Sequence, residues 1–317
     1  MAEHVVAILG TRYRDYSIEE QALGPLGVSL VSGDGSTADS IVEQAAGATV
    51  ILAGSRPRFD AGVLERLSCR GIVRYGVGTD SIDLDAARNL GIAVARVSDY
   101  GTAAVAFHAV SMALAQLRRL PEADRAIRAG SWGFADLRPM HEPSRLTAGV
   151  VGYGRIGRQV AAHLQCLGMR ILAHDPYVEI PDSQDPRPMD LVELLRLSDV
   201  VLLHAPGNPD GSPLLDGETL PQMRPGSVLV NTARGSLVDL PALLGGLRQG
   251  RPGRAALDVY PDEPVDVAVF GDLAERILLT PHMAWYTEES EADLRQKAAA
   301  EAARMLRGEP LVDSVGE

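Results

Sequence analysis

Short apolar runs rich in β-branched residues alternate with amphipathic segments through the first hundred residues. The apolar runs are Val5–Leu9, Val28–Val31, Thr49–Ala53, Gly71–Tyr75 and Ile92–Val97. Between some of them, Asp39–Ala46 and Asp83–Leu90 place their apolar residues at helical spacing. This alternation predicts βαβ units around a parallel sheet, because two parallel strands need a crossover connection that is usually a helix.

The segment that follows has a different pattern. Ala103–Leu120 is largely apolar and rich in alanine, and its length favours a buried helix over a strand. We expect Pro121 to end this helix. We expect Glu122–Ala129 to form a second, exposed helix that Gly130 closes.

The alternation of strands and helices resumes at Leu146. The strand candidates are Thr147–Gly152, Arg170–His174, Val200–His204, Val228–Thr232, Arg254–Val259 and Ile277–Thr280. The helix candidates are Arg155–Leu167, Leu191–Leu195, Asp216–Met223, Leu240–Gly250 and, after the last strand, Glu288–Arg307. Six parallel strands with intervening helices predict a doubly wound, Rossmann-type nucleotide domain.

The composition is that of an ordinary globular protein. The chain has 317 residues, of which 46% are hydrophobic and 23% charged, and this length suits two domains with separate cores. The formal net charge of −12 argues against general nucleic-acid binding, which needs a basic surface. It does not argue against a single basic pocket for a small anion.

Targeting signals and metal-ligand patterns are absent from the sequence. No apolar run approaches the roughly 18 residues that span a bilayer, and the N-terminal residues lack the basic and apolar regions of a signal peptide. Cys69 and Cys166 lie far apart, so we interpret them as two reduced thiols. We expect a cytoplasmic protein that binds neither membrane nor nucleic acid and holds no metal.

A glycine-rich motif lies between the first strand and the first helix of the second half. It consists of Gly152, Tyr153, Gly154, Arg155, Ile156 and Gly157. In such a motif the first glycine makes a tight turn, the second admits a pyrophosphate close to the backbone, and the third brings helix and strand together. The free N–H groups of the helix N-terminus then bind the phosphates.

An aspartate supports this interpretation. The next strand candidate, Arg170–His174, is followed at once by Asp175, about 20 residues beyond the glycines, where an acidic side chain binds the adenosine ribose hydroxyls. A carboxylate there repels the extra phosphate of NADP, so we predict NAD as the cofactor. The alternative is that Asp175 serves as a turn residue before Pro176, and the two roles are compatible.

Three further polar residues follow later strand candidates. Arg234, Glu263 and His282 come after the strands that start at 228, 254 and 277. Because ligands of open α/β sheets bind outside the carboxyl ends of the strands, we expect the three side chains to converge on the nicotinamide end of the cofactor. Taken singly, each has an alternative explanation as a surface charge, a turn acid or a structural histidine.

The three residue types suit hydride transfer to or from a hydroxy acid. A guanidinium holds a carboxylate bidentately and polarises a carbonyl. An imidazole exchanges a proton near neutral pH, and a neighbouring carboxylate favours its charged form and fixes its tautomer. Arginine and a charged histidine together supply the electrophile, so this chemistry needs no metal.

Over nearly its whole length the chain resembles the D-isomer-specific 2-hydroxyacid dehydrogenases. The resemblance rests on Gly71–Asp80, Gly149–Arg158, Asn231–Gly235, Leu257–Pro264 and Thr280–His282. Within that family, the Ala-Trp-Tyr sequence in Pro281–Tyr286 is similar to the C-terminal-binding-protein branch, which includes transcriptional corepressors.

The resemblance implies roles for individual residues. Arg234 binds the substrate carboxylate and keto oxygen, His282 donates the proton, and Glu263 is its partner. The residues implied to contact the cofactor, besides the glycine motif and Asp175, are His204, Ala205, Pro206, Thr232, Ala233 and, at the nicotinamide carboxamide, Asp258. The residues implied to contact the substrate, besides Arg234, are Arg74, Tyr75, Gly76, Val77, Gly78 and Trp285.

The resemblance also implies a domain layout. A Rossmann domain over residues 100–283 is inserted into a smaller, flavodoxin-like substrate domain made of residues 1–99 and 284–317, and the protein is a homodimer. One departure lies in the segment entering the first cofactor-domain helix, where relatives usually carry acids and this chain has Ala103, Ala104 and Phe107. We interpret His108, in the same segment, as structural.

We therefore predict an NAD-dependent oxidoreductase that interconverts a 2-keto acid and a D-2-hydroxy acid. Two alternatives stay open. One is a phosphoglycerate-type or phosphonate-type dehydrogenase of the same family, with Arg12, Arg14 and Arg74 as candidate anion contacts. The other is an NADH-sensing binding protein like the corepressors, although this chain keeps the whole Arg, Glu and His set. The sequence does not name the substrate.

Overall fold

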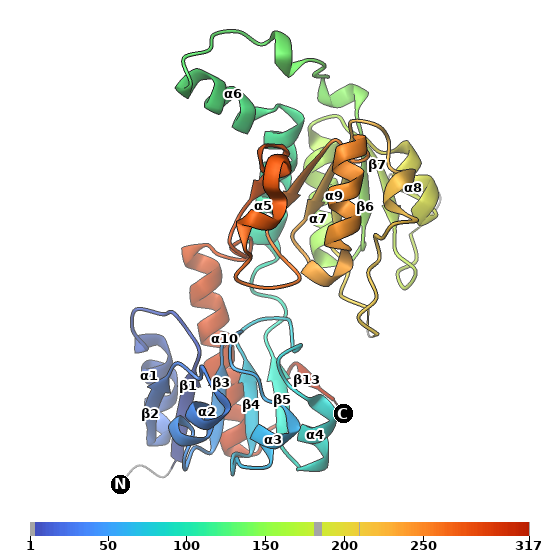
Figure 1. Ribbon diagram of the computed structural model, residues 1–317. Helices are drawn as coiled ribbons and strands as arrows, with labels where there is room; N and C mark the ends of the chain where they lie inside the picture. The colour runs from blue at the N-terminus through green and yellow to red at the C-terminus, as the bar shows by residue number, and fades with distance from the viewer. Residues whose placement is uncertain (1–3, 181–185, 209, 317) are drawn as a thin grey trace. The chain divides into compact units, whose positions relative to one another are not determined.

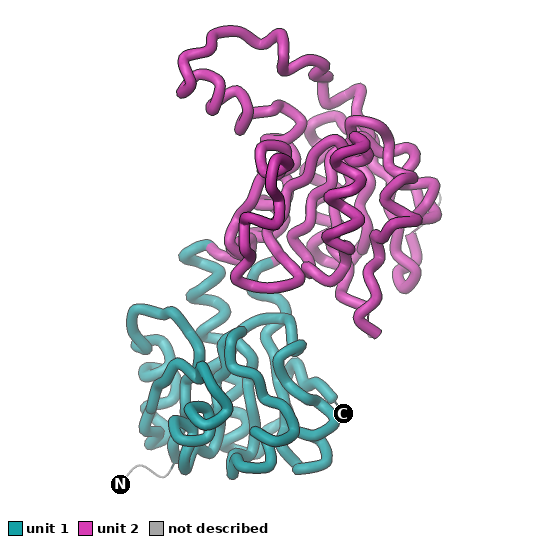
Figure 2. Tube along the Cα trace, in the orientation of Figure 1, with its two compact units in different colours: residues 1–101, 287–317 teal, residues 102–286 magenta. Residues whose placement is uncertain are grey.

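The computed structural model describes residues 4–180, 186–208 and 210–316. The chain forms two compact units, which Figure 2 distinguishes by colour. Unit 1 consists of Met1–Gly101 and Thr287–Glu317, and unit 2 consists of Thr102–Tyr286. No helix in the described part of the chain is long and apolar enough to cross a membrane.

Unit 1 is built on a six-stranded sheet. Its strands, in spatial order, are β2 (Val28–Gly33), β1 (His4–Leu9), β3 (Val50–Ala53), β4 (Gly71–Arg74), β5 (Ala93–Arg96) and β13 (Ser314–Val315). All neighbours are parallel except β13, which pairs antiparallel with β5. The order 2-1-3-4-5 of the parallel strands is flavodoxin-like, as predicted.

Helices line both faces of this sheet. Helix α10 (Glu288–Arg307) packs against β3 and β4 and against α1 (Ser17–Leu23). On the other face, at the front in Figure 1, lies a row of shorter helices: α2 (Ala38–Gln44), α3 (Ala61–Leu64) and α4 (Leu84–Asn89). Strand β3 is covered on both sides and fully buried, which is why its sequence is apolar without alternation.

Unit 2 contains a seven-stranded, wholly parallel sheet. Its strands, in spatial order, are β8 (Arg187–Pro188), β7 (Arg170–His174), β6 (Thr147–Val151), β9 (Val200–Leu203), β10 (Val228–Asn231), β11 (Arg254–Leu257) and β12 (Ile277–Leu279). Numbered along this unit, the order is 3-2-1-4-5-6 with one added strand, which is the Rossmann arrangement. The predicted fold class is confirmed.

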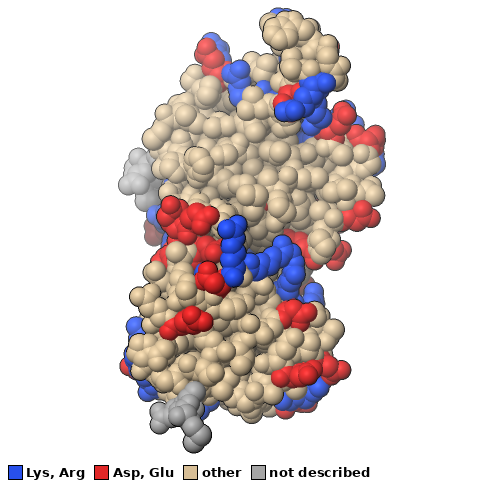
Figure 3. All heavy atoms as spheres, turned by 90° about the vertical axis from the view of Figure 1, so that its left-hand side faces the viewer, with Lys and Arg blue, Asp and Glu red and all other residues tan. Residues whose placement is uncertain are grey.

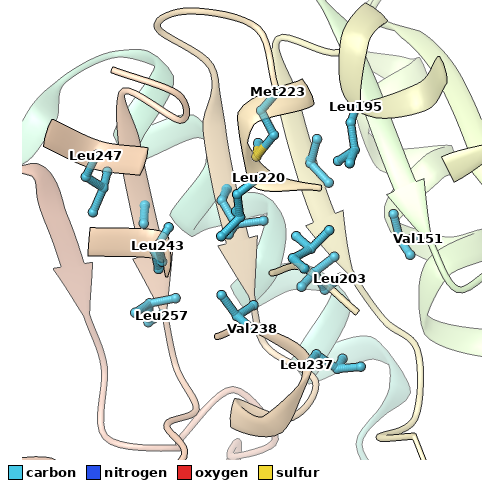
Figure 4. Packing of buried hydrophobic residues seen from close by; sticks show 14 of the residues in the cluster. Val151, Leu195, Leu203, Leu220, Met223, Leu237, Val238, Leu243, Leu247 and Leu257 are labelled. Carbon is cyan, nitrogen blue, oxygen red and sulfur yellow. The ribbon is translucent and has the colours of Figure 1, made fainter. Parts of the chain in front are cut away.

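The helices of unit 2 divide between the two faces of its sheet. Helix α5 (Thr102–Leu117) packs on α7 (Arg155–Cys166) and on β10, while α8 (Leu191–Leu197) and α9 (Leu240–Gln249) belong to the other core. Figure 4 shows that second core, in which Leu243 and Leu247 of α9 lie near Leu257 of β11, and Leu195 of α8 lies on the same side as Val151 of β6. Its residues are almost wholly buried, so the strand ends that they support are held firmly.

Several elements differ from the prediction. Asp216–Met223 is a turn with a short 3₁₀ helix at Leu220–Gln222, because Asp216 Oδ1 accepts hydrogen bonds from the N–H groups of Glu218 and Thr219 and so competes with helix formation. Pro121 does not end α5. That helix stops before Arg119, which has a φ of 54°, and Pro121 lies in the first turn of α6 (Leu120–Arg128), where proline is well tolerated.

Candidate active site

The glycine motif forms the turn between β6 and α7. Gly152 has a φ of +89°, and a Cβ there would lie 2.5 Å from the backbone nitrogen of Ala205. A Cβ on Gly157 would lie 2.0 Å from the Gly152 carbonyl oxygen. Gly154 differs, because a Cβ on it would meet nothing within 4 Å. Packing therefore requires the first and third glycines, whereas the second leaves open space beside the N-terminus of α7.

Asp175 ties the end of β7 to this motif. Its Oδ2 accepts a hydrogen bond of 2.7 Å from the Tyr153 N–H, and its Oδ1 accepts bonds from the N–H groups of Tyr177 and Val178 at 2.9 and 3.1 Å. The carboxylate is thus a turn residue, as the alternative interpretation held, and it also lies beside the glycine motif. Its contact with a ribose stays a prediction.

Two buried polar atoms follow the adjacent strands β9 and β10 and have no hydrogen-bond partner among the described residues. They are His204 Nε2 and Thr232 Oγ1. Burial lowers the pKa of His204 to about 4, so its ring is neutral. Buried polar atoms in native proteins nearly always have partners. A bound dinucleotide would supply them, and together with the open space at Gly154 these residues fit NAD.

Arg234, Glu263 and His282 lie after β10, β11 and β12, at the same edge of the sheet. His282 Nδ1 is 2.7 Å from Glu263 Oε2. Burial raises the pKa of Glu263, but the hydrogen bond and charge of His282, the Tyr260 N–H and the charge of Arg234 outweigh it, so the pKa lies below its ordinary value. The structure therefore brings the predicted residues together around an ionised carboxylate.

Asp258 lies beneath the segment that carries His282. It is 1% exposed. Its Oδ1 accepts hydrogen bonds from Thr280 Oγ1 (2.5 Å) and from the Met283 N–H (2.9 Å), and its Oδ2 accepts one from the Ala284 N–H (2.9 Å). The same residue's carbonyl accepts the His282 N–H at 2.8 Å. Asp258 thus holds the residues around His282, and the nicotinamide contact implied for it stays a prediction.

These bonds hold an unusual backbone. His282 has a φ of +51°, a region that residues other than glycine seldom occupy. Such conformations persist only where the surroundings enforce them, and they occur often at functional sites. His108, which we interpreted as structural, belongs to the same network, because its Nε2 lies 3.2 Å from Thr280 Oγ1. Its place on α5 gave no sequence signal of this contact.

The predicted substrate residues of unit 1 follow β4. Gly76 has a φ of +124°, and among the described residues the N–H groups of Val77 and Gly78 have no protein acceptor. The side chain of Arg74 lies beside Gly76, because a Cβ on that glycine would be 3.2 Å from Arg74 Nη1 and 3.3 Å from the Tyr100 hydroxyl. Tyr100 is not among the residues expected from the sequence.

The side chain of Tyr75 lies inside unit 1, although this residue was expected among the substrate contacts. Its side chain is 5% exposed, and its hydroxyl donates a hydrogen bond to Glu19 Oε1 at 2.9 Å. The side chain therefore points into the interior of unit 1 and is not available to a substrate. Only the backbone of this residue lies next to the free N–H groups of Val77 and Gly78.

Comparison with known proteins shows the family to which the chain belongs. The model of the D-isomer specific 2-hydroxyacid dehydrogenase NAD-binding domain matches residues 110–284. The (S)-sulfolactate dehydrogenase of Chromohalobacter salexigens is 37% identical over 79% of this chain and 82% of its own length. The chain belongs to the D-isomer-specific 2-hydroxyacid dehydrogenase family. It is an NAD-binding enzyme that acts on a CH–OH group.

Other members of the family are also similar to this chain in sequence and in structure. The D-3-phosphoglycerate dehydrogenase of Archaeoglobus fulgidus is 31% identical over 94% of this chain, which spans 58% of that protein's length. The structure of Escherichia coli D-lactate dehydrogenase has a TM-score of 0.85 at 30% identity and covers 98% of this chain and 99% of its own. An Aquifex aeolicus D-lactate dehydrogenase, solved with NAD and lactic acid, has a TM-score of 0.85 at 27% identity, with 96% of each chain covered.

An aromatic pair follows His282 in this dehydrogenase. Trp285 and Tyr286 pack edge to face with ring centroids 5.7 Å apart, and they follow Ala284, whose N–H is bound by Asp258. Trp285 is partly buried and Tyr286 is 41% exposed. The substrate contact implied for Trp285 and the similarity to the C-terminal-binding-protein branch stay predictions.

Proposed function

We propose that this dehydrogenase reduces a 2-keto acid to a D-2-hydroxy acid, or catalyses the reverse oxidation, with His282 as the proton donor and acceptor. Bound NAD supplies the hydride chemistry. Arg234 binds the substrate carboxylate and polarises the keto oxygen. As the carbonyl carbon gains hydride, His282 gives a proton to the oxygen, and Glu263 stabilises the charged imidazole before transfer.

One observation carries this proposal. Nδ1 of His282 is bonded to an ionised glutamate, while its Nε2 contacts no donor or acceptor among the described residues. A histidine held through one nitrogen with the other left open is the arrangement that acid–base catalysis needs. A sensing protein that only bound NADH would have no use for it.

We assign cofactor binding to unit 2 and substrate-carboxylate binding in part to unit 1. Unit 2 has the Rossmann strand order and the glycine motif. In unit 1, the adjacent N–H groups of Val77 and Gly78 form a small anion-binding site of the kind that successive backbone amides make. Arg74 supplies a positive charge beside them.

For the substrate, we favour a 2-keto acid that carries a second anionic group. The relatives named above for sulfolactate and phosphoglycerate act on such compounds. In unit 1, Arg12 and Arg14 follow β1, are exposed, and have no hydrogen bond or ion pair among the described residues. With Arg74 they are the candidate contacts, because guanidinium groups bind sulfonate and phosphate well.

A panel of substrates tests both the proposed reaction and the proposed substrate class. The loss of NADH absorbance is followed with pyruvate, phenylpyruvate, a branched-chain keto acid, sulfopyruvate and phosphohydroxypyruvate. We expect turnover of at least one, with the highest kcat/KM for a dianionic substrate. A preference for phenylpyruvate would refute the proposal that the substrate carries a second anionic group, but not the proposed reaction. NADH binding without turnover of any compound would favour the sensing function.

We further propose that the dehydrogenase is a homodimer that pairs through unit 2. Helix α6 and the coil after it extend away from the sheet of that unit (Figure 1). They expose four large apolar side chains, with exposed fractions from 51% to 92%: Leu120, Ile127, Trp132 and Phe134. Such a surface is typical of a protein interface.

Sedimentation tests the dimer. We expect Trp132→Ser to shift the protein towards monomer, while Val312→Ser, which also removes an exposed apolar side chain (75% exposed) but in unit 1, leaves it dimeric. A monomeric wild type would refute the proposal.

The surface charge gives no support for a nucleic-acid partner. On the face shown in Figure 3, basic side chains lie in small groups beside acidic ones. The cytoplasmic location stays a prediction.

A further inference from the structure

Unit 1 contains a buried ion pair between two of its helices. Glu19 of α1 is 0% exposed, and Arg295 of α10 is 6% exposed. Arg295 donates Nε to Glu19 Oε1 at 3.0 Å and Nη2 to Oε2 at 2.7 Å. This is the bidentate geometry in which a guanidinium binds a carboxylate most strongly. The third donor to the carboxylate is the Tyr75 hydroxyl, at 2.9 Å from Oε1.

The pair also holds the loop that follows β1. Nη2 of Arg295 donates to the Asp15 carbonyl oxygen at 2.7 Å, and its guanidinium carbon lies 4.7 Å from the centre of the Tyr13 ring. The Tyr13 ring in turn packs edge to face on Tyr75, with centroids 5.2 Å apart. One arginine thus joins α10 to α1, to the loop after β1 and to the residue that follows β4.

Stability alone is a weak explanation for this network. Taking a carboxylate and a guanidinium out of water is costly, and apolar residues of similar volume often stabilise a protein equally well. What a fully bonded polar network does provide is a defined geometry. Burial, followed by the charge of Glu19, raises the pKa of Tyr75 well above its ordinary value, so the hydroxyl keeps the proton that it donates.

The position of Tyr75 shows what this geometry controls. Its own N–H is bonded to the Ala53 carbonyl at 2.9 Å, and the next residue is Gly76, at a φ of +124°. Beyond it come Val77 and Gly78, whose N–H groups have no protein acceptor in the described structure. A side-chain anchor at Tyr75 therefore sets where these two groups point.

We propose that Arg295 and Glu19 are positioning residues, which act through the Tyr75 hydroxyl to hold the Tyr75–Gly78 segment in the conformation that binds the substrate carboxylate. They touch neither substrate nor cofactor. The inference rests on the proposed function, since it assigns that segment its ligand. It predicts that loosening the network weakens substrate binding while the chemical step and cofactor binding stay unchanged.

Tyr75→Phe is the primary test, because it removes only one hydroxyl. We expect KM for the keto acid to rise about fivefold to tenfold, in line with the net contribution of one typical hydrogen bond, with kcat and the Kd for NADH near wild type. Tyr16→Phe is the matched control, because its hydroxyl lies 3.1 Å from Thr11 Oγ1 in the same loop but outside the network. It should leave KM unchanged.

A second variant separates positioning from stability. Glu19→Met and Arg295→Met, made together with Tyr75→Phe, replace the pair by apolar residues and leave neither a buried charge nor the Tyr75 hydroxyl without a partner. We expect Tm to stay close to wild type while KM rises as in Tyr75→Phe. A wild-type KM in both variants would show that the network is structural only.

A readout without turnover keeps this test apart from that of the proposed function. Hydrogen–deuterium exchange of the peptide covering residues 74–80, which includes the bonded N–H groups of Tyr75 and Gly76, should be faster in both variants than in wild type or Tyr16→Phe. Faster exchange in a protein that turns over no keto acid would refute the proposed function and support positioning. Unchanged exchange would refute positioning whatever the activity.

Discussion

Replacing Asp258 by asparagine is the sharpest test of how His282, the proposed proton donor, is held in place. The aspartate accepts three hydrogen bonds, two of them from the N–H groups of Met283 and Ala284. Asparagine has nearly the same shape, but its amide nitrogen cannot accept a hydrogen bond. Whichever way the amide turns, at least one of these buried donors then faces another donor.

The size of the effect follows from burial. A buried donor left without an acceptor costs about 1–3 kcal/mol. For a domain of about 150–250 residues, the range in which unit 2 falls, each kcal/mol lowers Tm by about 2–4 °C. We expect a Tm about 2–12 °C lower. Because His282 holds a φ of +51° only while its neighbours are bound, we also expect kcat to fall about 10- to 100-fold, as for a small displacement of a reacting group.

Thermal unfolding and steady-state kinetics measure the two effects. Asp199→Asn is the matched control: Asp199 Oδ2 accepts the Thr147 N–H at 2.8 Å, at the opposite end of the strands from His282. It should lower Tm without lowering kcat at a temperature where both variants are folded. If Asp258→Asn kept wild-type kcat, or if both variants lost kcat in proportion to Tm, the positioning argument for His282 would be wrong.

Three further predictions concern single residues. His282→Gln should lower kcat by about 10²- to 10⁴-fold and leave the Kd for NADH unchanged; normal turnover would exclude it as the proton donor. Glu263→Gln should move the alkaline limb of keto-acid reduction to lower pH. The pKa of Glu263 is lower in the folded protein than in the unfolded chain. The pairing of Glu263 with His282 therefore stabilises the folded protein at pH values above the unfolded pKa of about 4.3, and this stabilisation is lost as the pH falls through the folded pKa. The Tm difference from wild type should shrink accordingly in acid. Asp175→Ala should weaken NADH binding and raise relative NADPH use; an unchanged preference would refute the ribose contact.

The convergence of the three proposed catalytic residues at one sheet edge could be predicted because its signals are local. Arg234, Glu263 and His282 each follow an apolar strand, and parallel strands bring their carboxyl ends to one edge. The glycine motif is local too, since Gly152 and Gly157 are required by contacts within one strand–turn–helix unit and its neighbouring strand end.

Residues whose roles depend on distant partners could not be predicted. Tyr75 was expected among the substrate residues with no direction for its side chain, and that direction is set by Glu19 and Arg295, which lie far away in the sequence. His108 on α5 meets Thr280 after β12, and no periodicity marks such a contact. Helix α1 was not predicted, because it is short and buries a glutamate where an apolar residue would have shown a helical pattern.

By itself, the sequence determined the fold class, the place of the dinucleotide motif and the residues that could exchange a proton. All of these depend on periodicity and residue type over short stretches, and both can be read directly from the sequence. Only the tertiary structure decided the other contacts around these residues. It bonded Asp258 to the segment that carries His282 and turned Tyr75 towards Glu19, because burial and hydrogen-bond partners come from segments that only folding brings together.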